Sequence, residues 1–591
     1  MRAGADRVSL DGGDPAAPLR PAGRPAGPTA GPTEYEVRFE RRTEARYIPV
    51  LFYLYLAVVV PFAIWRTTIV NWHVWFGPLS LAADLFAAMM FIIFLGFARY
   101  LYGPAHRPAD ISGGIVDCLV PTHTEPVSVI EPTVIAARRV RGIRNVLVLA
   151  NFERPEVRAM AERLGVSYQA RNSNEDGKAG NLNSGLIYTD ADFILTLDAD
   201  HMALPEFLER TLGYFDDPTV AFVQTPQSFY NTGSLLYRRA HGKDGEWSES
   251  NIFYRCVQPA KNGRNASFYV GTSAVLRRAA LDDVGGFATG TVTEDIHTSL
   301  RLHAKGWRSV FISEPLAFGL EAQSLREFYA QRRRWAVGSL TLLFRRADSP
   351  LRVRGLTAGQ RLSYLESMMA HLGGVQRLIH FLLPAVVIFS LTSPVNIPIG
   401  LYGLAFVAYF VASFGMVAIY SRGTYHFLHS DAYSLANLVA QVSALTGLLR
   451  TERRFKSARK DAHHAERTVV KPILWILGLT STAGVADGGY QIAAGNHSWL
   501  VIMATAWGAV NSVWMWWVLG YLEVYERRRD TNGLDGLAAP DRYRLIMERF
   551  SSSNNNNNNN NNGRAPAIAD PPLTTGSQSP ATTIALSLEE K

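Results

Sequence analysis

The chain contains little cysteine and little charge for its length. Cys118 and Cys256 are the two cysteines among 591 residues, which excludes a disulfide scaffold, and neither has the Cys or His spacing of a structural zinc site. Charged residues make up 19% of the sequence and hydrophobic residues 48%, a balance richer in apolar residues than a soluble enzyme needs. Both scarcities favour a protein that is largely cytosolic or intramembrane.

Neither end of the chain has a composition that can form a core. Residues 1–34 are rich in Gly, Pro, Ala and Arg and lack the apolar run of a signal peptide, so they are predicted to be a disordered cytosolic tail. Residues 526–591 include an asparagine run, 554–562, followed by Pro, Ser and Thr, and are predicted to be a second disordered cytosolic tail.

Six stretches approach the roughly 20 apolar residues that a membrane-spanning helix needs. Two lie within 35–102 and four within 358–525, at 47–67, 76–98, 372–392, 399–420, 473–493 and 498–521. Arginine clusters flank the first, third and sixth stretches and separate the fourth from the fifth, and the positive-inside rule places these flanks in the cytosol. We therefore expect a multi-pass protein of the cell (plasma) membrane, with residues 103–357 cytosolic. The net charge of +8 is attributed to these flanks and not to a nucleic-acid partner.

Ionisable residues inside the predicted spans include Asp84, Arg377 and Asp487, and a charge there is costly unless it meets a partner or a polar interior. Arg377 lies near the start of a span and is expected to extend toward the membrane interface. Asp84 lies within the second span, and Asp487 lies beside glycines that suit a close-packed polar lumen. The weakly amphipathic stretches 359–369 and 434–449 are predicted to be interfacial helices.

The segment 103–357 alternates strand-like and helix-like patterns, which predicts an α/β domain with a largely parallel sheet. The apolar runs 115–120, 146–149 and 193–197 are predicted strands, and a helix is predicted from Pro155. The third run ends in Asp198-Ala199-Asp200, at the strand end where such sheets bind ligands. Paired carboxylates there suit Mg²⁺ or Mn²⁺ shared with substrate phosphates, although Asp is also common in ordinary turns.

Six motifs occur in the order found in cellulose synthases and their relatives: VPTHTEP (120–126), KAGNLN (178–183), LDAD (197–200), QTPQSFYN (224–231), VTED (292–295) and QRRRW (331–335). Over about residues 45–525 the chain resembles these processive family-2 glycosyltransferases. The resemblance implies a Rossmann-like GT-A domain and a channel formed by the same chain. Together with the six predicted spans, this predicts a GT-A domain inserted in a six-helix transmembrane channel domain, although bacterial cellulose synthase has eight spans. The resemblance also implies inverting transfer of glucose from UDP-glucose to a growing β-glucan, β-1,4-linked as in cellulose, with export through the same chain.

The resemblance also implies roles on the donor side. Asp198 and Asp200 match the diphosphate and metal ligands, and Thr122 and Glu125 match the loop that holds the nucleotide. Lys178 matches a basic contact to the nucleotide, with a solvated surface lysine as the alternative.

On the acceptor side, Asp295 matches the general base of inverting relatives, which removes the proton of the acceptor hydroxyl as it attacks. A helix-capping role competes for its neighbour Glu294. Gln331, Arg334 and Trp335 suit leaving-group and acceptor contacts, since guanidinium groups grip diphosphates and an indole stacks on a pyranose. The alternative is a basic interfacial helix, with Arg332 and Arg333 meeting lipid headgroups.

Two positions depart from the pattern of the relatives. Ala150 stands where they carry a uracil-binding Asp, so Asn151 is the remaining candidate for that hydrogen bond. Ala458 replaces a Thr in the gating-loop-like segment 455–460. Alternative functions therefore stay open. The chain could make a different β-glycan (β-1,3-glucan, mannan or an amino-sugar polymer), could transfer a single sugar to a lipid carrier, or could be a channel-forming subunit without activity. Accessory polysaccharide-processing proteins or a second copy of the chain are candidate partners.

Overall fold

The computed structural model describes residues 39–41, 47–104, 113–230, 237–239, 246–248, 250–322, 324–421, 425–449 and 469–527. All of them belong to one compact unit, Met1–Tyr543. The predicted tails, apart from residues 526 and 527, and the gating-loop-like segment 455–460 lie outside these ranges.

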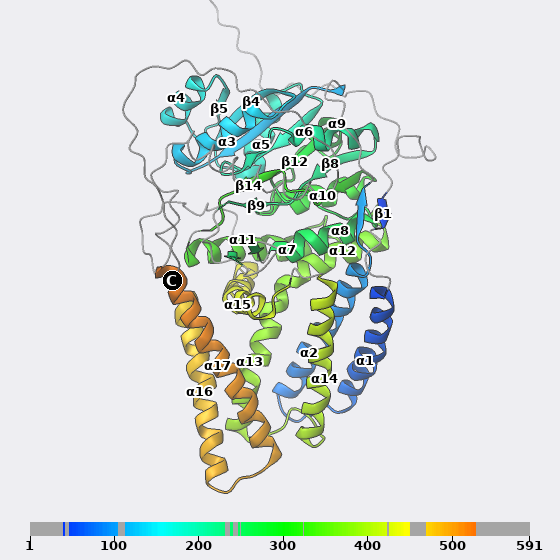
Figure 1. The fold of residues 1–591 in the computed structure, drawn as a ribbon, viewed down its shortest axis with the longest axis vertical. Coiled ribbons are helices and arrows are strands. Elements are labelled where there is room, and N and C mark those ends of the chain that lie inside the picture. Colours follow the sequence, from blue (N-terminus) through cyan, green and yellow to red (C-terminus); the bar gives the residue numbers. More distant parts are fainter. Residues whose placement is uncertain are drawn as a thin grey trace, which may run out of the picture. The chain divides into compact units, whose positions relative to one another are not determined.

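A seven-stranded sheet forms the centre of the α/β region (Figure 1), in the order β13-β8-β12-β6-β3-β4-β5. Strand β12 is antiparallel to its neighbours β6 and β8, whereas every other neighbouring pair is parallel. Every residue of β3, β6 and β8 is buried, which explains their continuous apolar runs. The predicted α/β class and its largely parallel sheet are confirmed. The strands are β3 Val116–Thr122, β4 Ile143–Ala150, β5 Ser167–Ala170, β6 Phe193–Thr196, β8 Val220–Gln224, β12 Ala274–Arg277 and β13 Arg308–Phe311.

The α/β region also contains helices and a second, three-stranded sheet, whose first strand follows the loop after β6. The helices are α3 Val127–Arg139, α4 Pro155–Arg163, α5 Gly177–Ile187, α6 Phe207–Thr211, α7 Ser250–Ile252, α8 Gln258–Asn262, α9 Arg278–Asp283 and α10 Glu294–Ala304. The second sheet has the order β7-β14-β9, with β7 Met202–Ala203, β14 Ala317–Gly319 and β9 Ser228–Phe229. Two short pairs are β1 Phe39–Arg41 with β2 Tyr102–Pro104, and β10 Tyr237–Arg239 with β11 Glu246–Ser248.

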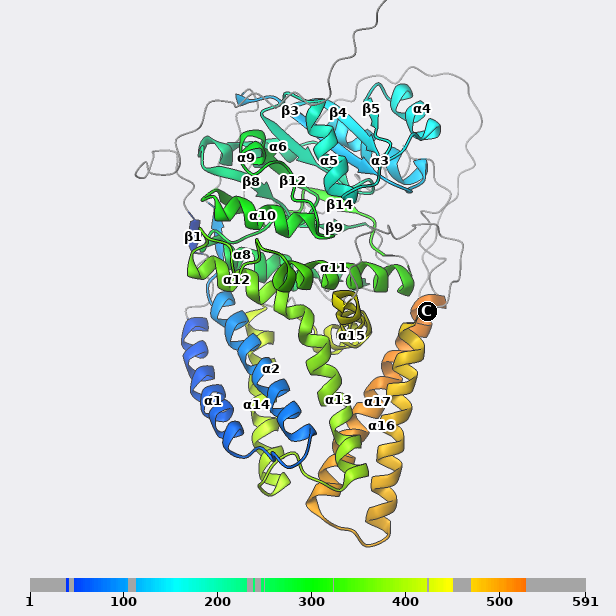
Figure 2. The same cartoon turned by 180° about the vertical axis from the view of Figure 1, so that it is seen from behind.

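Four described helices are long and apolar enough to cross a membrane, judged by length and composition (Figure 2). They are α1 Ile48–Thr68, α2 Phe76–Ala98, the continuous helix Ala358–Ser390 that joins α12 Ala358–Met369 to α13 Gly373–Ser390, and α14 Ile399–Tyr420. Helices α16 Val470–Ala493 and α17 Trp499–Arg527 have sufficient length but are not among the four. Six spans therefore stay a prediction.

Helix α11, Leu325–Arg345, connects the α/β region with the apolar helices by packing on α15, Phe427–Leu449. The rings of Phe328 and Tyr433 meet edge to face at 5.3 Å, and the hydroxyls of Tyr329 and Ser443 lie 3.0 Å apart. The stretches predicted at 359–369 and 434–449 are helical, as parts of α12 and α15. Their position at a membrane surface stays a prediction.

The ionisable residues of the apolar helices have partners. Arg66 Nε donates to Asp84 Oδ2 at 2.7 Å. Arg377 Nη2 donates to Asp431 Oδ2 on α15 at 2.5 Å, and its extension toward a membrane interface stays a prediction. Asp487 accepts a hydrogen bond from Gln491, one turn further along α16.

Candidate active site

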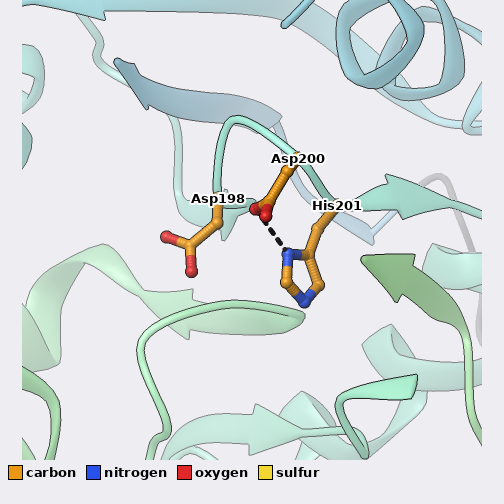
Figure 3. Close-up of side chains that lie close together, drawn as sticks. All are labelled: Asp198, Asp200 and His201. Carbon is orange, nitrogen blue, oxygen red and sulfur yellow. Dashed lines mark hydrogen bonds and ion pairs between the residues drawn. The ribbon is translucent and has the colours of Figure 1, made fainter. Parts of the chain in front are cut away.

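The two aspartates that end the third predicted strand lie beyond the carboxyl end of β6. The hydroxyl of Thr272, on the segment leading into β12, accepts from the backbone N–H of Asp198 in a 2.9 Å contact, which holds this loop against its neighbour. Figure 3 shows Asp198, Asp200 and His201 together on the loop, with the contact between Asp200 Oδ1 and His201 Nδ1 at 3.0 Å. Ligand atoms of all three lie within 4.8 Å of one another. Two carboxylates and an imidazole form a donor set that fits Mg²⁺ or Mn²⁺.

His201 belongs to this site, and the sequence reasoning missed it. The side chain is buried, and its Nε2 has no hydrogen-bond partner among the residues that the structure describes. A buried nitrogen of this kind can be satisfied by a bound ion or ligand. Gly319 makes room for the ring, since a Cβ there would lie 2.3 Å from His201 Cε1. The available signal was the His directly after the Asp-Ala-Asp sequence.

Lys178, in the first turn of α5, reaches the same loop. Its Nζ pairs with Asp198 Oδ1, donates to the carbonyl oxygen of Gly271 at 2.7 Å and lies 3.8 Å from Glu294 Oε1. Burial opposes the charged form of Lys178, but Asp198 and the other acidic neighbours outweigh it and raise the pKa of the ammonium group above its usual value. The lysine therefore carries its positive charge beside the candidate metal ligands.

Asp295 approaches this group from α10, with Gly271 between it and Lys178. A Cβ on Gly271, whose φ is +89°, would lie 3.1 Å from Lys178 Nζ and 3.3 Å from Asp295 Oδ2. Burial and the neighbouring carboxylate of Glu294 raise the pKa of Asp295 to about 7. Glu294 points toward Lys178, and Thr293, the N-cap residue, forms no side-chain capping bond.

The QRRRW residues lie on α11, and all five side chains are partly exposed. Gln331 and Trp335 are one turn apart and share a face of the helix. Arg332 stacks over three rings, with its Cζ 4.4 Å from the centre of Trp335 and further contacts to Phe328 and Tyr433. Arg332 thus packs against aromatic rings of α11 and α15. A contact of Arg332 or Arg333 with lipid headgroups stays a prediction.

Hydrogen bonds within the loop and to β4 hold the segment predicted to contact the nucleotide. The hydroxyl of Thr122 donates to the carbonyl oxygen of Leu149, and Glu125 accepts from the N–H of His123 at 2.7 Å. Asn151 is buried, and its side-chain oxygen accepts from Arg171 Nε at 2.9 Å. This oxygen already has a donor, so the proposed hydrogen bond from uracil to Asn151 would have to share it.

Comparisons with known proteins indicate a family for this chain. Residues 193–428 match the model of the glycosyl transferase family group 2. Cellulose synthase 1 of Komagataeibacter xylinus is 34% identical over 473 residues, covering 76% of this chain and 30% of that protein. A UDP-forming cellulose synthase catalytic subunit of the same species is 30% identical, covering 76% of this chain and 62% of the subunit. The corresponding subunit of Xanthomonas axonopodis pv. citri is 36% identical, covering 51% and 42%.

Among solved structures, a mannosyltransferase from Pyrobaculum calidifontis in complex with GDP-Man and Mn²⁺ aligns with a TM-score of 0.43 and 18% identity, over 62% of this chain and 99% of that one. The family match, the sheet order and the aspartates at β6 define a glycosyltransferase of the GT-A class. The chain belongs to the cellulose-synthase-like family-2 glycosyltransferases. It spans between 30% and 62% of the length of the three cellulose synthases just described.

Proposed function

We propose that the chain is a processive, inverting glycosyltransferase that polymerises glucose from UDP-glucose into a β-1,4-linked glucan and moves the product across the cell membrane. The observation that carries this proposal is the convergence of Lys178, Asp198 and Asp295 around Gly271 at the end of β6. The relatives support the donor and product, since three are named cellulose synthases and two of these are named UDP-forming.

On the donor side, Asp198, Asp200 and His201 would hold Mg²⁺ or Mn²⁺. A bound divalent cation would offset the negative charge that develops on the leaving diphosphate. Lys178 supplies a fixed positive charge next to Asp198 for the same purpose. Thr122 and Glu125 shape the loop where the nucleotide would lie.

On the acceptor side, Asp295 removes the proton from the attacking hydroxyl. Its pKa of about 7 lets the carboxylate exist near neutral pH and still accept a proton with useful strength. Arg334 would contact the leaving diphosphate, while Gln331 and the ring of Trp335 would hold the sugar at the chain end. Helix α11 carries these residues and packs on α15, so the acceptor site adjoins the apolar helices.

The test uses membrane vesicles that contain the full chain. They are incubated with Mg²⁺ or Mn²⁺ and one labelled donor at a time: UDP-glucose, UDP-N-acetylglucosamine or GDP-mannose. We expect a long polymer from UDP-glucose alone, which disappears with EDTA and is digested by a β-1,4-specific endoglucanase. Polymer from another donor would contradict the sugar assignment, and products limited to single sugars on lipid would contradict processivity.

A further inference from the structure

Helices α10 and α11, which carry Asp295 and Trp335, touch at a glycine. A Cβ on Gly338 would lie 2.5 Å from Thr293 Cγ2, closer than real contacts allow. The helices can approach this closely only because residue 338 has no side chain. Gly338 lies one turn beyond Trp335, and Thr293 directly precedes the first turn of α10. This contact fixes the distance between α10, which carries Asp295, and α11, which carries Trp335.

A second contact joins the same helices through His297, whose ring is fully buried. His297 Nε2 lies 2.5 Å from Asp348 Oδ2, and Nδ1 lies 3.2 Å from the hydroxyl of Thr291. Asp348 stands three residues beyond the end of α11, and Arg301 Nε donates to the same oxygen at 3.0 Å. With Nε2 donating to Asp348 and Nδ1 accepting from Thr291, both ring nitrogens of a neutral imidazole are satisfied.

The charges around Asp348 stabilise its contact with His297. The hydrogen bond from His297 and the charge of Arg301 lower the pKa of Asp348 well below its usual range, so the carboxylate stays ionised. Arg346 adds a second guanidinium 3.5 Å from Asp348 Oδ1. Because the His297 ring is buried, truncating Asp348 leaves the Nε2–H of His297 without its acceptor.

We propose that His297, Arg301 and Asp348 form a positioning clamp, which holds α10 against α11 so that Asp295 meets a sugar acceptor resting on Trp335. The clamp contacts neither substrate and acts through the placement of Asp295. This inference rests on the proposed function, in which Asp295 is the general base. A misplacement of about 1 Å in such an arrangement can cost about 100-fold in rate.

The test measures kcat and KM for UDP-glucose in vesicles carrying Asp348→Asn, Asp348→Ala, His297→Gln or His297→Ala. We expect kcat to fall about tenfold or more in the two Ala variants and less in the two conservative variants, with KM nearly unchanged. Labelled UDP binding shows that each variant is folded, and if Asp348→Ala does not bind UDP, the Asn and Gln variants decide. Asp282→Asn is the matched control, since Asp282 pairs with Arg278 at 2.8 Å on α9 and the same change there should leave both constants unaltered.

Two results would overturn the clamp: an unchanged kcat in the UDP-binding variants, or a raised KM with kcat preserved. Asp295→Asn is measured in parallel. If that variant still makes polymer, the proposed base is wrong whatever the clamp variants do. If it makes none while the clamp variants behave as the wild type, the clamp alone is contradicted.

Discussion

Two ion pairs in this chain resemble each other chemically but differ in their surroundings. Arg66 and Asp84 lie between α1 and α2, and their side chains are 0% and 1% exposed. Asp84 also accepts from the Tyr402 hydroxyl at 3.1 Å and contacts His380 Nε2 at 2.8 Å. The pair of Lys178 and Asp198 is 18% and 33% exposed. We call Arg66 and Asp84 the closed pair and Lys178 and Asp198 the open pair. The closed pair is shut off from solvent and can only support the fold, whereas the residues of the open pair can exchange each other for a ligand.

The largest expected effect is the loss of transfer when the open pair is broken. Asp198→Asn should lower the rate of polymer synthesis about a thousandfold, because a neutral amide cannot replace a carboxylate beside developing diphosphate charge. The thermal unfolding midpoint should change little, since Lys178 keeps its bond to Gly271 and its contact with Glu294. Vesicle assays and unfolding in detergent measure the two quantities. If Asp198→Asn lowered the unfolding midpoint strongly but left the rate of polymer synthesis unchanged, the pair of Lys178 and Asp198 would support the fold and not the reaction.

Breaking the closed pair should lower the stability of the fold, whereas breaking the open pair should lower the rate of transfer. Asp84→Leu leaves the Arg66 charge buried without its carboxylate, which should cost about 3 to 5 kcal/mol of unfolding free energy. The double variant Arg66→Met with Asp84→Leu should recover most of that loss, because it removes both charges. Unfolding of the detergent-solubilised protein gives both values. Equal stability of Asp84→Leu and the wild type would show that this pair is dispensable.

The open site should also respond to pH. Asp295 acts as a base only when ionised, and its pKa is raised from 3.8 to about 7. The rate should therefore be level above about pH 8 and fall about tenfold per pH unit well below pH 7. Lys178 stays protonated over this range because its pKa is raised, so UDP binding should not follow the same curve. A rate that is flat between pH 5 and 8 would contradict this assignment.

The smallest expected effect concerns His201, which is buried like the closed pair yet belongs to the open site. Gly319→Ala places a methyl group against the imidazole and should cost about 1 to 3 kcal/mol of unfolding free energy while lowering the rate of transfer. Gly520→Ala, where a Cβ meets nothing within 4 Å, is the matched control and should be neutral. Unchanged metal dependence and stability in Gly319→Ala would remove His201 from the site.

The sequence predicted the parts of this structure that depend on local patterns. Buried strands such as β3 and β6 are continuous apolar runs, and the aspartates after β6 follow from the position of the strand end. His201 directly follows these aspartates, but the room for its ring comes from Gly319, more than a hundred residues later, and no local pattern reveals that contact. Likewise Arg377 finds Asp431 only after α13 and α15 pack together. Partners distant in the sequence were the ones missed.

The central claim is that Asp295 is the base for glycosyl transfer at an open, charged site. Its most direct test is polymer synthesis from labelled UDP-glucose in vesicles carrying Asp295→Asn, with UDP binding measured on the same preparation. The account predicts that this variant binds UDP as the wild type does and makes no polymer. Undiminished polymer synthesis by Asp295→Asn would contradict it.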